Sequence, residues 1–315
     1  MTDQAMNVLI TGASGFIGGH LCAALQGAGH RVVALVRRGR PFPDRVPVPI
    51  CEYAPDALSE TISRFGAKDG LDAVVHAAGK INGSADGLRE ANEAMTRTVV
   101  AGLEQSGADA SLVYLSSVSA IGPLGSYGAS KRAAEQVIAS SNLRRWTILR
   151  PSLVYGPGDT KNVARLVEAV RAWPIVPVIG AGGVRLQPLY VGDLCDVIRH
   201  VLDGAGEARG IYTVAGPRQE RLVDMIRLIR QRLGRRNVLL PLPLRPIQVA
   251  VRLARPLLSR TSFPVQQVVT LHDHPAWDAA RAVEQLSFRP RRFEEGLSMM
   301  IPQVARPAEG IGAAA

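Results

Sequence analysis

Short apolar runs alternate with amphipathic stretches through the first half of the chain. Runs rich in β-branched residues predict strands at Asn7–Ile10, Val32–Val36, Ala73–His76, Leu112–Leu115 and Thr147–Leu149. Helical patterns fall between strands, for example at Phe16–Gly27 and Ser126–Ser140. Because the strands are apolar on both faces, we expect helices on both sides of a doubly wound parallel sheet. The fold class is therefore α/β.

The regular alternation ends after Pro151, where glycine and proline become frequent. Leu189–Val191, a helix at Asp193–Leu202 and a strand at Ile211–Val214 are expected to return to the main sheet. The chain beyond Pro217 reads as mostly helical and proline-rich. This predicts a main domain over 5–154 and 187–216, a smaller capping region over 155–186 and 217–305, and a flexible tail over 306–315.

A glycine-rich turn, TGASGFIG, joins the first predicted strand to the first helix. Gly12, Gly15 and Gly18 have the spacing at which a backbone approaches a pyrophosphate, with helix N–H groups directed at the phosphates. The same turn contains three further candidates for contacts with the cofactor, Ser14, Phe16 and Ile17. The turn and the strands around it predict a Rossmann-type dinucleotide-binding domain.

Two arginines end the second predicted strand. NAD-specific domains place a carboxylate there to bind the ribose 2′-hydroxyl, whereas this strand ends with Arg37 and Arg38. Guanidinium groups suit a 2′-phosphate. We therefore expect NADP as the cofactor, with NAD and a merely solvated basic loop as the alternatives.

The segment YGASK contains the candidate acid/base pair. Tyr127 and Lys131 are four residues apart and share one face of a predicted helix, where a lysine charge favours ionisation of the phenol. Upstream, Ser116 and Ser117 end a strand at the carboxyl edge of the sheet, where doubly wound folds bind ligands. His76 ends another strand, and we expect it to be packed rather than catalytic.

These motifs resemble the extended branch of the short-chain dehydrogenase/reductase superfamily, the NAD(P)-dependent epimerase/dehydratase proteins. The resemblance rests on TGASGFIG, HAAG, YLSSVSAIG, YGASK, LRPSLVYGPGD and LYVGDL, in that order. It implies that Tyr127 is the catalytic acid/base, Lys131 its partner and Ser117 the substrate-bonding hydroxyl, with Ser116 as the rival. It also implies cofactor contacts from Ala77, Ala78, Gly79, Pro151 and Ser152.

Departures from the family pattern narrow the expected chemistry. Val118 and Ser119 stand where sugar dehydratases have an Asp-Glu pair, which argues against a dehydratase. Leu153 stands where many nucleotide-sugar enzymes have an asparagine that contacts the diphosphate. The segment from Ser117 to Tyr127 is also short for this branch. A hydrophobic small-molecule substrate is therefore expected.

Composition and charge exclude several other classes. The formal charge is +10, but only four of the 37 basic residues are lysines and no basic block occurs, so no nucleic-acid partner is predicted. No apolar run is long enough to span a bilayer, and the N-terminus lacks the pattern of a signal peptide. With three cysteines and no metal-ligand spacing, we expect a reducing cytoplasm and no metal. An amphipathic stretch at 244–260 reads as a lid helix or a peripheral membrane contact, and a homodimer is left open.

The leading functional prediction is an NAD(P)-dependent oxidoreductase that interconverts a secondary alcohol and a ketone by hydride transfer. The same residues would serve a nucleotide-sugar or lipid-linked sugar 4-epimerase, which is the alternative. A third interpretation is a non-catalytic dinucleotide-binding protein.

Overall fold

A computed structural model of the 315-residue chain describes residues 5–39, 42, 48–122, 125–179, 183–243, 249 and 275–301. The chain divides into two compact units. The first contains Met1–Ser152, Val191–Ala215 and Trp277–Pro290, and the second contains Leu153–Tyr190, Gly216–Ala276 and Arg291–Ala315. Each unit is described by itself.

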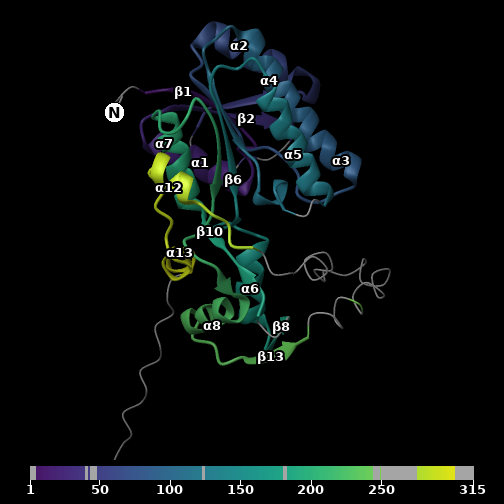
Figure 1. The fold of residues 1–315 in the computed structure, drawn as a ribbon, viewed down its shortest axis with the longest axis vertical. Coiled ribbons are helices and arrows are strands. Elements are labelled where there is room, and N and C mark those ends of the chain that lie inside the picture. The colour runs from purple at the N-terminus through teal and green to yellow at the C-terminus, as the bar shows by residue number, and fades with distance from the viewer. Residues whose placement is uncertain are drawn as a thin grey trace, which may run out of the picture. The chain divides into compact units, whose positions relative to one another are not determined.

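The first unit is built on a seven-stranded sheet in the order β11-β6-β5-β4-β1-β2-β3 (Figure 1). Every neighbouring pair is parallel. The strands are β1 (Asn7–Thr11), β2 (Arg31–Arg37), β3 (Ile50–Tyr53), β4 (Ala73–His76), β5 (Ser111–Leu115), β6 (Trp146–Pro151) and β11 (Arg209–Val214). The predicted doubly wound sheet is confirmed. Its strand order reverses between β1 and β4, which is where such folds bind ligands.

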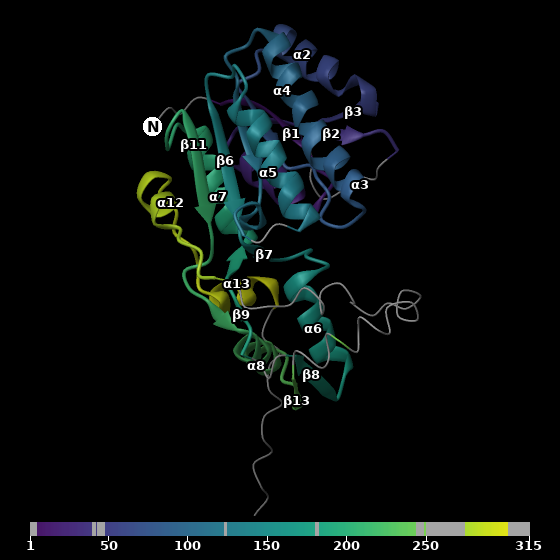
Figure 2. The same ribbon diagram turned by 45° about the vertical axis from the view of Figure 1, so that its right-hand side comes forward.

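Helices cover both faces of this sheet (Figures 1 and 2). One face carries α2 (Leu58–Asp69), α4 (Met95–Ser106) and α5 (Ser126–Ala139), and the other carries α1 (Phe16–Gly27) and α7 (Val191–Leu202). Short elements complete the unit: η1 (Pro55–Ala57), α3 (Ala85–Arg89), η2 (Glu90–Ala94) and η3 (Val118–Ala120). Burial on both faces explains why the strands are continuously apolar.

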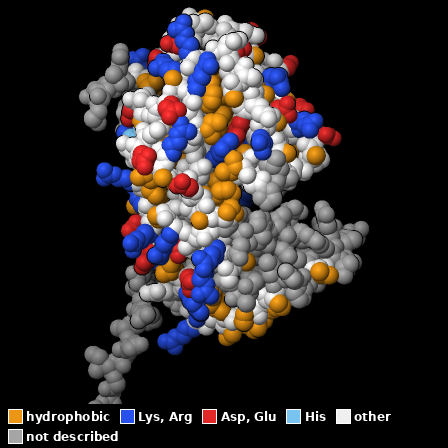
Figure 3. Space-filling model, in the orientation of Figure 1, with side chains coloured by type: hydrophobic (Ala, Val, Ile, Leu, Met, Phe, Trp, Pro, Cys, Tyr) orange, Lys and Arg blue, Asp and Glu red, His pale blue; other side chains and the backbone are white. Residues whose placement is uncertain are grey.

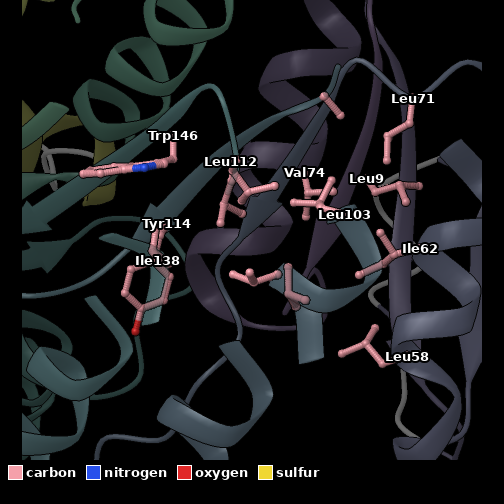
Figure 4. Packing of buried hydrophobic residues seen from close by; sticks show 14 of the residues in the cluster. Leu9, Leu58, Ile62, Leu71, Val74, Leu103, Leu112, Tyr114, Ile138 and Trp146 are labelled. Atoms are coloured by element: carbon pink, nitrogen blue, oxygen red, sulfur yellow. The ribbon is translucent and has the colours of Figure 1, made fainter. Parts of the chain in front are cut away.

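The main core lies between the sheet and the α2–α4–α5 layer (Figure 4). Leu9, Val74 and Leu112 come from three adjacent strands and are at most 1% exposed. Leu58 and Ile62 of α2 pack in the same cluster. This packing fixes the positions of the parallel strands, and the candidate site lies at their carboxyl ends.

A late segment of the chain joins the outer strand of the first unit. α12 (Ala280–Gln285) packs against β11, and Gln285 accepts a hydrogen bond from the Tyr212 hydroxyl at 2.9 Å. The carbonyl of Leu286 is 3.0 Å from Nδ1 of His200. The capping region expected from the sequence includes 277–290, whereas these contacts attach that segment to the first unit.

Within its described residues, the second unit contains three small two-stranded sheets and three helices. Its strands are β7 (Leu153–Tyr155), β8 (Ile175–Ile179), β9 (Arg185–Leu186), β10 (Pro188–Tyr190), β12 (Glu220–Arg221) and β13 (Val238–Leu242). Its helices are α6 (Asn162–Ala172), α8 (Leu222–Arg232) and α13 (Phe293–Met300). Tyr155 is fully buried at its centre, where its ring contacts those of Tyr190 and Phe293 and its hydroxyl donates to the Phe293 carbonyl at 3.1 Å.

One expected strand lies in a different sheet from the one predicted. Leu189–Val191 was predicted to rejoin the main sheet, but residues Pro188–Tyr190 form β10 and pair in parallel with β7 in the second unit. Local apolar pattern indicates a strand, but its partner depends on residues distant in sequence. The predicted stretch 244–260 and the tail 306–315 lie outside the described residues, apart from the single residue 249.

Candidate active site

The glycine turn follows β1 and begins α1. Gly12 has φ +71°, in the left-handed region that glycine enters without strain. Its carbonyl accepts from the Gly15 N–H at 2.9 Å, which closes the turn before the helix begins at Phe16. The first helical turn reads Phe-Ile-Gly-Gly and therefore contains no carboxylate. Its N–H groups and its dipole favour an anion.

The turn has no room for larger residues at two glycines. A Cβ added at Gly12 would lie 2.6 Å from the Ala78 amide nitrogen, and one at Gly18 would overlap the Gly12 carbonyl. The first glycine thus brings two strand ends close together, and the third brings α1 onto β1. Ser14 and Gly15 are exposed, whereas Phe16 and Ile17 are partly exposed, so the outer side of the turn is open to a ligand. These residues fit a dinucleotide pyrophosphate.

A second turn, Ala77–Gly79, follows β4 beside the first. The Ala77 N–H donates to the Thr11 carbonyl at 3.2 Å, so the ends of β4 and β1 are joined. A Cβ at Gly79 would lie 2.6 Å from Oδ1 of Asn92 and 3.3 Å from Nζ of Lys131. A side chain here would displace the buried Asn92 amide, and the position lies next to the predicted catalytic lysine.

Asn92 fixes this second turn and is not among the residues predicted from the sequence. Its fully buried amide accepts from the Lys80 N–H and donates to the Lys80 carbonyl, each at 3.0 Å. It also donates to Oγ of Ser130 at 2.9 Å, and that hydroxyl donates to the Tyr127 carbonyl at 2.8 Å. Asn92 thereby joins the cofactor-side turn to the helix that contains Tyr127.

Asn92 lies in η2, a π-helical turn between α3 and α4. Such turns occur often at functional sites. A signal was present in the sequence, because Leu88, Asn92, Thr96, Val99 and Leu103 follow one helical stripe that is otherwise mostly apolar. Polar residues at buried helical positions require partners, and here both polar members are fully buried and bonded.

Ser116 and Ser117 follow β5 and have different partners. The Ser116 hydroxyl is buried and donates to Glu135. Ser117 begins the 3-10 turn η3, where its Oγ accepts from the Ser119 N–H at 3.1 Å. It also forms a side-chain hydrogen bond with Tyr127. Of the two serines, Ser117 is the one that contacts the predicted acid/base.

Tyr127 and Lys131 lie one turn apart on α5. Nζ of Lys131 donates to the Leu115 carbonyl at 2.8 Å and to the Tyr114 hydroxyl at 3.2 Å. Burial raises the pKa of Tyr127, and its hydrogen bond with Ser117 opposes this. Burial lowers the pKa of Lys131 to about 7, and the nearby Glu135 carboxylate opposes this. Lys131 therefore titrates close to neutral pH.

A buried ion pair lies behind the lysine. Arg150 donates through Nη2 to Oε2 of Glu135 at 2.6 Å and through Nε to Oε1 at 2.9 Å. Glu135 is 5% exposed and follows Lys131 by four residues on α5. Bidentate pairing compensates for burial of the carboxylate. The pair links β6 to α5 close to Lys131.

His76 is packed, as expected. It is fully buried, with Nδ1 2.6 Å from Oγ1 of Thr11 and Nε2 3.1 Å from Oγ1 of Thr96. Burial lowers its pKa to about 3, and the charge of Lys131 adds to this. His76 is therefore neutral across the physiological range.

The remaining predicted cofactor residues also lie at strand ends in the first unit. Arg37 ends β2 and is partly exposed, and Arg38 follows it and is exposed, with its N–H donating to the Tyr53 carbonyl at 3.0 Å. Pro151 ends β6 and is buried. Ser152 is held by its N–H to the Val214 carbonyl at 2.9 Å. The structure thus brings all the predicted site residues to one edge of one sheet, and it places Leu153 in the second unit.

A parallel sheet with this strand order and a glycine turn at the switch point defines the Rossmann class of α/β proteins. The chain belongs to the NAD dependent epimerase/dehydratase family, whose profile matches residues 8–215.

Among proteins of known name, the chain is similar to a ceramide reductase of Caulobacter vibrioides. The two are 35% identical over 194 residues, which are 61% of this chain and 59% of that protein. It is also similar to a 2-alkyl-3-oxoalkanoate reductase of Stenotrophomonas maltophilia, at 32% identity over 209 residues, 59% of this chain and 62% of that protein. Each match thus spans about six-tenths of the relative's own length.

Solved structures show the same fold across nearly the whole chain. MoeE5 in complex with UDP-glucose and NAD superposes with a TM-score of 0.73 at 22% identity, covering 93% of this chain and 97% of that one. A UDP-glucose 4-epimerase of Thermotoga maritima gives 0.73 at 19% identity, covering 94% and 97%. Within the described residues, no helix is both long and apolar enough to cross a bilayer.

Proposed function

We propose that this chain is an NAD(P)-dependent oxidoreductase that interconverts a secondary alcohol and a ketone. One observation carries the proposal: Ser117 is hydrogen-bonded to Tyr127, and Lys131 lies on the same helix beside the Gly79 turn. All of these residues lie at the sheet edge that also holds the glycine turn after β1. Pyrophosphate binding is assigned to Gly12–Gly18, and Ala77–Gly79, Pro151 and Ser152 are assigned to the rest of the dinucleotide.

A bound nicotinamide would supply hydride transfer to the carbonyl carbon or from the alcohol carbon. In the reductive direction the Tyr127 hydroxyl would give its proton to the carbonyl oxygen. Ser117 donates a hydrogen bond to the same oxygen and stabilises the charge that develops there. In the oxidative direction the Tyr127 oxygen removes the hydroxyl proton, and a charged Lys131 makes that removal easier.

The proposed substrate is a hydrophobic carbonyl compound. Two relatives are named as reductases of a ceramide and of a 2-alkyl-3-oxoalkanoate, both of which carry hydrocarbon chains. Leu153 cannot donate or accept a side-chain hydrogen bond, so a nucleotide diphosphate would lose a partner there. The role of 155–186 and 217–305 as a substrate-capping region stays a prediction, as does the cytoplasmic location.

The test replaces the proton donor while the ring is kept. With NADPH and a panel of hydrophobic ketones, Tyr127→Phe is expected to lower kcat/KM by about a hundredfold or more. The matched control is Tyr212→Phe, because Tyr212 is a buried tyrosine of the same unit whose hydroxyl bonds to Gln285. Its turnover should stay close to that of the parent chain.

Unchanged turnover in Tyr127→Phe would remove the tyrosine from the mechanism and end the proposal. If the ketones fail while a UDP-hexose is epimerised at C4, the 4-epimerase alternative replaces it. Binding of the dinucleotide without either reaction would favour the non-catalytic interpretation.

We also propose NADP rather than NAD as the cofactor. Arg37 ends β2 and Arg38 follows it, with no carboxylate in the segment 31–39, and each can form charge-assisted hydrogen bonds to a 2′-phosphate. Titration by tryptophan fluorescence should show NADPH binding about tenfold or more tighter than NADH.

The double variant Arg37→Gln/Arg38→Gln should bring the two affinities together. The control is Arg145→Gln, because Arg145 is 57% exposed and precedes β6 at the opposite, amino edge of the sheet. Equal affinities in the parent chain, or tighter NADH, would contradict the NADP proposal and leave the oxidoreductase proposal standing.

A further inference from the structure

The strands β8 and β13 of the second unit pair in parallel and form a two-stranded ribbon. Apolar side chains lie on both of its faces. Ile175 pairs with Val238, and Pro177 pairs with Leu240. On β8 the alternate residues Val176 and Val178 are only 3% and 2% exposed, so they form the buried face. The opposite face is the outward one.

This outward face is apolar rather than polar. Ile175 is 52% exposed, Val238 61% and Leu240 46%, and Trp173, just before β8, is 48% exposed. A half-buried sheet in water usually carries polar side chains on its outer face. Figure 3 shows hydrophobic side chains gathered over this end of the second unit. We call these four residues the β8–β13 face.

Backbone and side-chain hydrogen bonds hold the ribbon together. The Val238 N–H donates to the Pro174 carbonyl at 2.9 Å. The Asn237 amide donates to the Val170 carbonyl at 2.9 Å and also to the Trp173 carbonyl. These hydrogen bonds hold the ribbon in place, while its apolar side chains remain exposed at the surface.

Arginines border the face. Arg235 and Arg236 precede β13 and are exposed, and Arg171, two residues before Trp173, is also exposed. The segments 168–178 and 233–243 together contain these three arginines and a single acidic residue, Glu168, which is 3.0 Å from Arg171. Because Arg171 is paired with Glu168, the net positive charge of these segments comes from Arg235 and Arg236, in a chain whose formal charge is +10.

We propose that the β8–β13 face docks on an anionic lipid surface. Exposed aliphatic side chains enter the boundary of the acyl chains, a tryptophan suits the headgroup level, and arginines pair with anionic headgroups. A second copy of this chain is a poorer partner, because a symmetric contact would place the same arginine borders against each other. The proposal is independent of the oxidoreductase activity and uses residues outside the stretch 244–260.

The experiment is cosedimentation of the full chain with vesicles of phosphatidylcholine alone or with added phosphatidylglycerol. The parent chain should bind the anionic vesicles, more weakly at high salt, and bind the neutral ones least. Val238→Thr/Leu240→Thr should weaken binding about tenfold, because threonine is compatible with a strand and removes apolar surface. Arg235→Gln/Arg236→Gln should remove the preference for anionic vesicles.

The matched control is Ile50→Thr, since Ile50 is 49% exposed on β3, an edge strand of the first unit. Its vesicle binding should equal that of the parent chain. Thermal melting and light scattering without lipid accompany each variant. Absence of binding, or equal binding by the threonine variant, overturns the proposal.

Two other results would also overturn the proposal. If Val238→Thr/Leu240→Thr melts several degrees below the parent chain, other parts of this chain cover the face. If it converts a dimer to a monomer, the face is an interface between copies.

Discussion

The candidate active site of the first unit and the β8–β13 face of the second depart from the usual distribution of residues in opposite ways. At the site, Asn92, His76, Lys131 and Glu135 are at most 5% exposed, although all four are polar or ionisable. At the β8–β13 face, apolar side chains are about half exposed or more. Buried polar groups and exposed apolar groups are the informative exceptions in a folded protein.

The two regions differ in whether their unusual side chains have partners within the chain. The buried polar groups of the site are bonded within the chain, as the contacts of Asn92 and the Glu135–Arg150 pair show. The described residues of the β8–β13 face still present apolar surface to solvent. The polar groups of the site therefore have partners within the chain, whereas the apolar groups of the face are exposed to solvent.

The largest loss of stability is expected when one buried hydrogen-bonding side chain of the site is replaced. Asn92→Leu keeps the side-chain volume but leaves both backbone groups of Lys80 and the Ser130 hydroxyl without it. We expect the free energy of unfolding to fall by about 2–4 kcal/mol in urea denaturation. Asn142→Leu, at an exposed position before β6, should change it by no more than about 0.5 kcal/mol. Equal effects would show that burial of Asn92 has no energetic consequence.

The pH dependence of stability tests the buried histidine. The pKa of His76 is about 3 in the folded chain against an ordinary value of 6.5. Between these values the unfolded chain binds the proton and the folded chain does not, so stability falls as pH decreases through this window. The contribution is at most about 1.4 kcal/mol per pH unit.

His76→Asn should therefore lose less stability than the parent chain between pH 6.5 and 4.5, by up to about 3 kcal/mol. Thr96→Val, which removes a hydrogen bond and keeps the histidine, should retain the parent slope. Urea denaturation at both pH values measures this, and parallel slopes for His76→Asn and the parent would contradict the assignment.

The smallest effect is expected at the β8–β13 face. Because Val238 is 61% exposed, Val238→Thr should change the free energy of unfolding by less than about 0.5 kcal/mol. Measuring this variant and Asn92→Leu in the same urea series compares the stability contributions of the two regions directly. A loss as large as that of Asn92→Leu would show that Val238 is covered in solution.

Local pattern was sufficient for the framework of the first unit. The strands β1, β2, β4, β5 and β6 were predictable, because buried parallel strands are short apolar runs separated by helices. The turn at Gly12–Gly18 and the Tyr127/Lys131 pair were equally visible, since each is defined by spacing within one segment. Their position at one edge followed from the rule that parallel strands end on the same side.

Only the tertiary structure decided which distant segments meet. β10 looks like any strand, and its pairing with β7 in the second unit depends on a partner more than 30 residues away. The attachment of 277–290 to β11 and the three contacts of Asn92 likewise join residues remote in sequence. The apolar outward face of β8 and β13 has the same origin, because a run such as Val238–Leu242 shows that a strand forms but not which face is buried. Local pattern reflects backbone preference and burial in general, whereas pairing and exposure are set by the energy of the whole packed chain.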